Sequence, residues 1–142
     1  MTMYSGLSPV NGSDIQNTFS QSGLMVKYDA GGLMSTAGVT DKPIGVTIDE
    51  SSRDAAGSLE AAGTGTVSII PFSGVQYIRC ITNGAVKLGA PVYMAQTAEA
   101  DGHCKVNDAT NSAQFVGYYM GEDGLTPSTG DLIPVSCHPV VA

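Results

Sequence analysis

The alternation of short apolar runs with turn-forming residues constrains this chain more than any other feature of its sequence. From residue 23 onward, apolar runs are separated by turn signals such as Asn83-Gly84 and Asp101-Gly102. Residues 75–82 form the clearest run, because β-branched and aromatic side chains occur throughout it. Short strands separated by turns at regular spacing are typical of antiparallel β proteins. The pattern therefore predicts an all-β fold.

The turn signals also predict how neighbouring strands connect. Gly31-Gly32 follows the apolar run 24–28 and indicates a hairpin. Asn83-Gly84 is typical of a type I′ turn. Residues 49–63 are Ala- and Gly-rich and predict a surface loop with at most one or two helical turns. The expected strands are residues 24–28, 33–34, 44–48, 64–72, 75–82, 92–95, 103–106, 114–120 and 132–137.

The arrangement of these strands has two solutions. No amphipathic helix is long enough for a β-α-β crossover, which excludes a parallel α/β sheet. Many short strands at intervals of about 8–12 residues are found in closed barrels and in two-layer sandwiches. A sandwich of this kind would be jelly-roll-like. The sequence leaves the choice between barrel and sandwich open.

Composition excludes several classes of protein and partner. The 142 residues suffice for one domain, and only 13% of them are charged, about half the usual quarter. Such a surface disfavours a helical bundle, a coiled coil or a disordered tail. The net charge is -7 and the six basic residues are scattered singly, so we expect neither nucleic-acid nor membrane binding. Residues 1–10 lack the pattern of a signal peptide, and the chain is expected to stay where it is made.

Cysteine and histidine give one candidate metal site. The three cysteines are odd in number and widely spaced, which favours a reducing compartment over a disulfide framework. His103-Cys104 and Cys137-His138 contain four residues of types that bind zinc. Neighbouring side chains in a strand point to opposite faces, however, and the usual ligand spacing is missing. We expect buried cysteines beside exposed histidines, with no metal and no cofactor.

The sequence contains no convincing catalytic motif. A Gly-x-Ser-x-Gly elbow and a phosphate-binding Gly-rich loop are both absent. The carboxylate pairs Asp49-Glu50 and Glu122-Asp123 lie beside turn residues, where solvated side chains are expected. Tyr93, Tyr118 and Tyr119 could form a surface patch or pack in the core with hydroxyls at its rim. We therefore expect a protein that is not an enzyme.

Residues 1–22 differ from the remainder of the chain. They contain one charged side chain, the turn signals Ser8-Pro9 and Asn11-Gly12, and few apolar residues. This content is too sparse for a separate core, so it predicts an extended arm that orders against a partner. Residues 23–142 are then a single β domain. The side chains expected to make the contact are Leu7, Val10, Ile15 and Phe19.

The order of features from residue 23 to residue 135 resembles the capsid decoration, or cement, proteins of bacteriophage heads. The most telling stretch is residues 83–93. The family repeatedly shows there a small residue and a glycine, then two variable positions and a valine. The other matching stretches are residues 25–32, 42–46, 55–57, 61–63, 67–70, 74–75, 115–118 and 130–135.

The resemblance implies a compact β-barrel or β-tulip-like domain that forms a homotrimer. It implies that the trimer binds the major capsid protein on the outer surface of the icosahedral head, after synthesis in the host cytoplasm. The arm residues would then contact the shell or a neighbouring copy. Two other functions remain open: another virion component, such as a head-fibre base or tail protein, and a non-viral β-barrel that binds a small molecule.

Overall fold

The computed structural model is an all-β protein, as the sequence predicts. It describes residues 10–13, 19, 21–28, 34–38, 40–50, 52–60, 65–95, 102–110 and 113–138. Within these residues no helix is long and apolar enough to cross a membrane. The strands are β1 (Val10–Ser13), β2 (Met25–Tyr28), β3 (Met34–Thr36), β4 (Gly45–Thr47), β5 (Thr66–Pro71), β6 (Gly74–Arg79), β7 (Pro91–Met94), β8 (Cys104–Val106), β9 (Phe115–Tyr119) and β10 (Leu132–Cys137).

The first sheet contains the N-terminal strands in the order β1-β5-β4-β2-β3, and every neighbouring pair is antiparallel. β2 and β3 form the predicted hairpin. β1 lies within the predicted arm and pairs with β5, so that Val10 stands opposite Ile69. Part of the arm is therefore an edge strand of this sheet.

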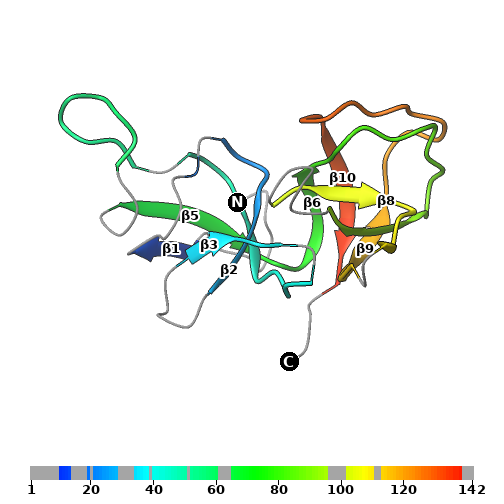
Figure 1. Ribbon diagram of the computed structural model, residues 1–142, viewed down its shortest axis with the longest axis horizontal. Helices are drawn as coiled ribbons and strands as arrows, with labels where there is room; N and C mark the ends of the chain where they lie inside the picture. The colour runs from blue at the N-terminus through cyan, green and yellow to red at the C-terminus, as the bar shows by residue number, and fades with distance from the viewer. Residues whose placement is uncertain are drawn as a thin grey trace, which may run out of the picture.

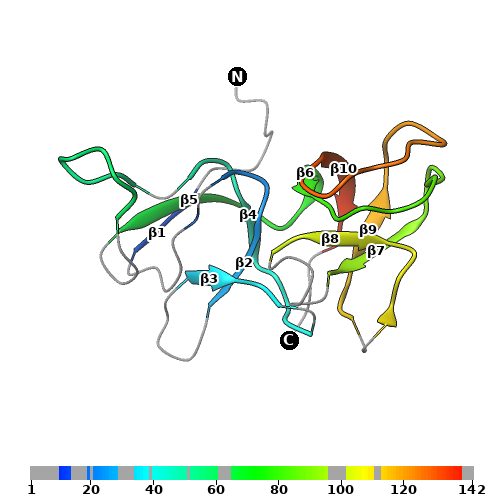
Figure 2. The ribbon, with the colours of Figure 1, turned by 45° about the horizontal axis from the view of Figure 1, so that its top comes forward.

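The second sheet contains the C-terminal strands in the order β6-β10-β9-β7-β8. Its two edges approach each other at one point, where Cys80, just after β6, forms an isolated parallel bridge with Cys104 of β8. The Ile81 N–H donates a hydrogen bond of 3.0 Å to the Cys104 carbonyl there. A closed barrel is not found among the described strands. The two sheets lie beside each other, joined where β5 leads into β6 (Figures 1 and 2).

One apolar core connects the two sheets. Its largest cluster joins Met25 and Val46 of the first sheet to the inward-facing residues of the second, including Ile78, Val92 and Tyr119. A smaller cluster lies on the first sheet and contains Phe19, which is fully buried with Leu24, Val26, Val67 and Ile69. Because the large cluster spans both sheets, the sheets share one interior.

The sequence predicts most strands correctly but misjudges one turn. Asn83 does not have the positive φ that a type I′ turn requires, and no hairpin forms there. Its N–H donates to the Pro127 carbonyl and its side-chain amide to the Val106 carbonyl. Val86 nearby is fully buried. Long-range contacts thus override the local turn preference. Residues 52–60 form the exposed loop that the sequence predicts.

Gly23 connects the two sheets through its own backbone. Its N–H donates to the Thr47 carbonyl of β4 at 2.7 Å, and its carbonyl accepts from the Arg79 N–H of β6 at 2.8 Å. Its φ is 80°, a conformation that favours glycine. A Cβ at this position would lie 2.5 Å from the Leu132 side chain. Gly23 therefore meets both a backbone and a packing requirement.

Replacing Gly23 by alanine should destabilise the whole fold. Gly57→Ala is a matched control, because Gly57 also has a positive φ of 85° but open space around its Cβ position. We expect a loss of about 1 kcal/mol for Gly57→Ala from the backbone alone. Gly23→Ala should lose about 1 kcal/mol more, because the Leu132 and Arg79 side chains must shift. Urea unfolding of both variants measures this difference, and equal losses would contradict the role of Gly23.

Candidate functional site

The second sheet has an outward face that is rich in apolar and aromatic side chains. Residues that stand opposite each other in antiparallel strands share a face, so the register identifies its members. Val75 and Tyr77 of β6 are the most open of them, with 54% and 62% of each residue exposed, and Leu132 of β10 and Tyr118 of β9 follow with 43% each. We call this set the outer face: Val75, Tyr77, Arg79, Pro91, Tyr93, Lys105, Phe115, Tyr118, Leu132, Pro134 and Ser136.

A β-bulge brings two aromatic residues of β9 onto the outer face. Tyr93 stands opposite Phe115, but the preceding residue of β7, Val92, stands opposite Gly117, so β9 contains one extra residue. Phe115 and Tyr118 are three positions apart, and regular alternation would place them on opposite faces. The bulge shifts this alternation, and Val116 turns into the core.

The aromatic rings of the outer face contact one another. The Phe115 ring lies 5.8 Å from that of Tyr93 and 5.3 Å from that of Tyr118. The His138 imidazole, just after β10, lies 5.3 Å from the Tyr118 ring in an edge-on arrangement. These contacts hold the rings in place while Tyr118 remains 43% exposed. The four rings therefore form an ordered aromatic cluster at the surface.

The sequence named part of this cluster. Tyr93 and Tyr118 belong to it, whereas Tyr119 is fully buried and its hydroxyl donates to the Glu122 carbonyl at 2.8 Å. Both interpretations of the three tyrosines are thus correct, each for different residues. Sequence reasoning missed Phe115 and His138, because their position depends on the bulge and on where β10 ends.

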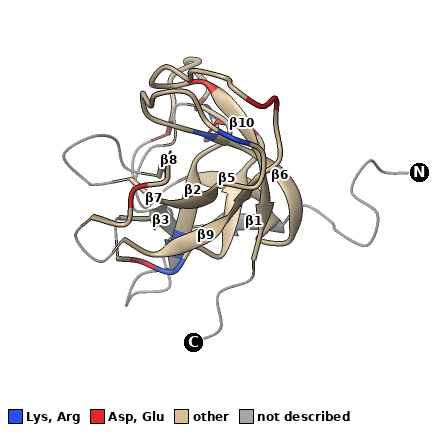
Figure 3. Cartoon of the chain, turned by 90° about the vertical axis from the view of Figure 1, so that its right-hand side faces the viewer, with Lys and Arg blue, Asp and Glu red and all other residues tan. Residues whose placement is uncertain are grey.

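The outer face carries little free charge. None of its members is acidic, and the two basic ones are engaged by other groups. The Arg79 guanidinium donates to the Ser22 and Gly130 carbonyls, and the Lys105 ammonium lies 2.7 Å from the Asp108 carboxylate. Seen from the side of the second sheet, the strands are mainly tan and the acidic residues lie on loops (Figure 3). Few charges would have to be desolvated if this face were covered.

The opposite face of the second sheet contains the three cysteines. Cys80, Cys104 and Cys137 are buried free thiols in the core. Burial raises the pKa of the Cys137 thiol to about 12. Burial and the nearby Asp131 charge raise the pKa of the Cys80 thiol to about 11. The pKa of the fully buried Cys104 thiol is also raised well above its usual value, first by burial and then by the other two thiols.

The candidate zinc residues are not brought together as four ligands. Cys137 points into the core, whereas its neighbour His138 is exposed and joins the aromatic cluster. His103 is buried, with 8% of the residue exposed, so the expectation of an exposed histidine is wrong for this residue. In the described parts of the chain, no group of three or more His, Cys, Asp or Glu residues is placed to hold a metal ion.

The carboxylate pairs lie at loops, as the sequence predicts. Asp49 accepts a hydrogen bond from the Glu50 N–H, and Glu50 forms an ion pair of 2.7 Å with Arg53. Asp123 accepts from the Leu88 N–H at 3.0 Å, and both Asp123 and Glu122 are exposed. These contacts stabilise loops.

The four arm residues have different positions. Leu7 and Ile15 lie outside the described residues. The backbone of Val10 begins β1, and Phe19 is fully buried in the small cluster of the first sheet. The Phe19 side chain is therefore unavailable to a partner in this conformation.

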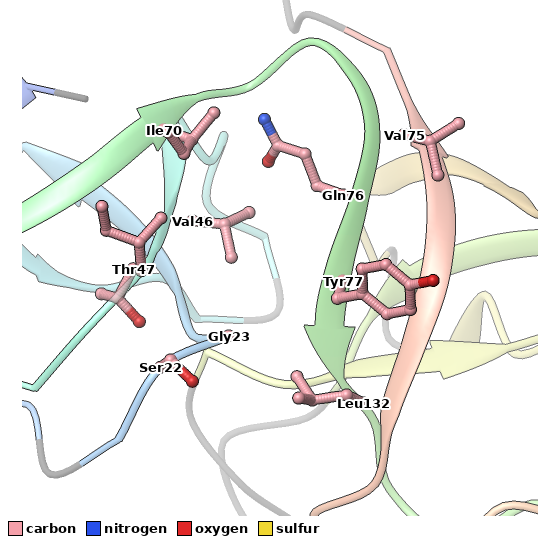
Figure 4. Close-up of a pocket in the computed structure, with 10 residues that line it drawn as sticks. Ser22, Gly23, Val46, Thr47, Ile70, Val75, Gln76, Tyr77 and Leu132 are labelled. Carbon is pink, nitrogen blue, oxygen red and sulfur yellow. The ribbon is translucent and has the colours of Figure 1, made fainter. Parts of the chain in front are cut away.

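A cavity of about 310 Å³ lies between the two sheets, beside the edge of β6 (Figure 4). Val46, Thr47, Ile48 and Ile70 line it from the first sheet. Ser22 and Gly23, just before β2, also line it, and Val75, Gln76, Tyr77 and Leu132 line it from the second sheet. None of these side chains is charged. The cavity is therefore an uncharged groove lined by both apolar and neutral polar side chains.

Comparison of the sequence with protein-family models finds no match, and comparison with curated proteins also finds none.

The buried thiols should make the stability of the fold sensitive to alkaline pH. Thiols of the unfolded chain lose their protons near the ordinary pKa of 9.0, whereas the folded thiols keep theirs until about pH 11 to 12. The unfolded state thus binds fewer protons above pH 9, and the free energy of unfolding must fall as pH rises. Urea unfolding between pH 8 and 10.5, in the presence of reductant, measures this loss.

Lysine and tyrosine side chains also titrate in this range, so the test compares two proteins. Cys104→Ala is the control, because it removes one thiol and leaves the other titrating groups in place. Its stability should fall less steeply than that of the parent protein, by up to about 1.4 kcal/mol per pH unit. Equal slopes would show that Cys104 does not contribute.

Proposed function

We propose that this protein is a capsid decoration protein, which binds the outside of an icosahedral virus head as a trimer and clamps neighbouring major capsid proteins. The observation that carries the proposal is the outer face, an apolar and aromatic sheet surface with its two basic side chains already engaged. The resemblance of the sequence to phage decoration proteins supplies the partner.

The composition of the outer face suits a protein-protein contact. Interface centres are depleted in charged residues and enriched in aromatic ones. Tyrosine is frequent among the residues that carry most of the binding energy. The ring contacts of Tyr118 order its side chain before binding, which reduces the entropy lost on association. Repetition over a shell then multiplies modest contacts into strong retention.

The N-terminal arm supplies a second contact in this proposal. Leu7, Val10 and Ile15 remain its candidate residues for the shell or a neighbouring copy. Phe19 is left out, because its side chain is buried in the protein's own core. The barrel or β-tulip-like shape also belongs to this proposal. It is supported by the approach of β6 and β8 at the Cys80–Cys104 bridge.

Removing aromatic side chains from the outer face should weaken binding to heads. The test variant is Tyr93→Ser combined with Tyr118→Ser, and binding to heads that lack the protein is measured by co-sedimentation. Loss of two central aromatic residues should weaken binding at least tenfold, because one such residue is typically worth about 2 kcal/mol.

Leu88→Ser is the matched control, since Leu88 is an apolar residue with 57% exposure outside the outer face. It should bind heads as the parent protein does. Unchanged binding of the double variant would refute the docking role of this face. Copy number separates the remaining roles: a decoration protein is present in hundreds of copies per particle, and a head-fibre base or tail component in far fewer.

The trimer is a separate prediction. Light scattering at micromolar concentration should give a mass three times that of the chain. The Leu88→Ser variant should give the same mass, which controls for non-specific association through exposed apolar groups. A stable monomer under these conditions would contradict the trimer.

A further inference from the structure

The outward edge of β6 has backbone groups that the described residues leave unpaired. The Arg79 N–H points away from β10, because it donates to the Gly23 carbonyl. Backbone groups alternate in direction along a strand, so those of Val75 and Tyr77 also point away from β10. Within the described chain, no hydrogen bond reaches the N–H or the carbonyl of Val75 or Tyr77. Both residues are more than half exposed, so these four backbone groups are open to a partner.

The cavity beside this edge contains a buried acceptor that is also unpaired. Gln76 is 5% exposed, and its side-chain nitrogen donates to the Pro71 and Ser73 carbonyls. These two bonds fix the orientation of the amide. Its Oε1 is buried and has no hydrogen-bond partner in the described structure. The amide lies between Ile70 and β6 at the wall of the cavity (Figure 4). A buried acceptor without a donor is costly, so an occupant that brings a donor is favoured.

The spacing of the open backbone groups points to an extended peptide as the occupant. Val75 and Tyr77 are two residues apart in a strand, a distance of about 7 Å. The N–H and carbonyl groups of an extended peptide repeat at the same distance, so one strand pairs with both residues. The bond between Gly23 and Arg79 closes the edge beyond Tyr77. The cavity volume of about 310 Å³ also limits the occupant to a short segment.

The surroundings of this edge disfavour a charged segment. None of the residues that line the cavity is charged. The basic side chain of β6, Arg79, is already engaged by the Ser22 and Gly130 carbonyls. A charged group placed in the cavity would lose its water without gaining an ionic partner. The site therefore fits a neutral strand.

We propose that β6 and the cavity bind a short, uncharged segment of a partner protein, which adds as a strand to Val75 and Tyr77 and donates a hydrogen bond to Gln76. The second sheet is antiparallel throughout its described strands, and the added strand takes the same direction. Its residue opposite Gln76 shares the face of Gln76, with the two Cβ atoms about 5 Å apart. Serine or threonine there supplies the donor that Oε1 lacks.

The flanking residues of the segment lie on the outer face of the sheet. They stand opposite Val75 and Tyr77, where β-branched and aromatic cross-strand pairs are favourable. The site thus recognises a central hydroxyl residue between two β-branched or aromatic residues.

This inference does not depend on the proposed function. The test of capsid docking changes Tyr93 and Tyr118, which lie on β7 and β9, whereas the partner strand adds to the edge at β6. Each proposal can therefore fail while the other stands.

Amide hydrogen exchange of the full-length protein, read by NMR, tests whether the edge is open. In the protein alone, the Val75 and Tyr77 amides should exchange at least 100-fold faster than those of Gln76 and Ile78, which face β10. Equal protection of all four at every protein concentration would show that the protein itself covers the edge. Protection of Val75 and Tyr77 that disappears on dilution would assign the edge to a second copy. Either result would overturn the proposal.

Two neutral synthetic peptides then probe the site in the full-length protein. The first is acetyl-Ser-Val-Thr-Val-Ser-amide, and the second has valine in place of the central threonine. In saturating excess, the first should slow exchange of the Val75 and Tyr77 amides at least tenfold. The second has nearly the same shape but lacks the hydroxyl, so it should bind about fivefold more weakly, as expected for one hydrogen bond. No response to the threonine peptide, or equal binding of the two peptides, would overturn the proposal.

A pair of variants at Tyr77 separates edge pairing from contact with the exposed ring. Tyr77→Pro removes the outward N–H without breaking a bond to β10, and proline is tolerated at a strand edge in this direction. Tyr77→Ala keeps the N–H and removes the ring. Titration of the threonine peptide, followed by the Val75 amide shift, should show at least tenfold weaker binding to Tyr77→Pro than to Tyr77→Ala. Circular dichroism confirms that both variants are folded, and equal binding to the two would overturn the proposal.

Discussion

The backbone of Gly23 links the two sheets directly, beside the apolar core that they share. It donates to Thr47 in the first sheet and accepts from Arg79 in the second, so one residue takes part in both hydrogen-bond systems. The Arg79 side chain reinforces the junction by donating to the Ser22 carbonyl. The Thr47 hydroxyl accepts from the Leu24 N–H and is almost completely buried. A Cβ at this position would require the neighbouring Leu132 and Arg79 side chains to shift.

This junction determines which surfaces remain open. The first sheet bonds the outward edge of β6 at Arg79 through Gly23, and a second contact joins Met25 and Ala37 to Gly102, just before β8. The part of the β6 edge at Val75 and Tyr77 borders a cavity. The inward face of the second sheet is filled by the shared core, and the cysteines occupy part of that interior. Its other face carries the aromatic cluster. Tyr77 and Tyr118 on this face are exposed, whereas the end at Leu132 lies close to Gly23. The candidate binding surfaces therefore follow from how the sheets are joined.

The sequence predicts local structure in this protein better than it predicts the site. Alternating and β-branched runs identify β2, β4, β5, β6, β9 and β10, because these patterns reflect the two faces of a strand. The prediction of a type I′ turn at Asn83-Gly84 is wrong, because Asn83 is held by hydrogen bonds to residues far away in the chain. The aromatic cluster could be predicted only in part. Phe115 reaches it through a bulge in strand pairing, which a single sequence does not specify.

An image reconstruction of virus heads that carry the protein, at side-chain detail, tests the proposed role most directly. The account predicts trimers on the outside of the shell, with Tyr93, Phe115 and Tyr118 of the second sheet buried against the major capsid protein or a neighbouring copy. Trimers whose aromatic cluster faces solvent on every side, or heads without the protein on their surface, would contradict it.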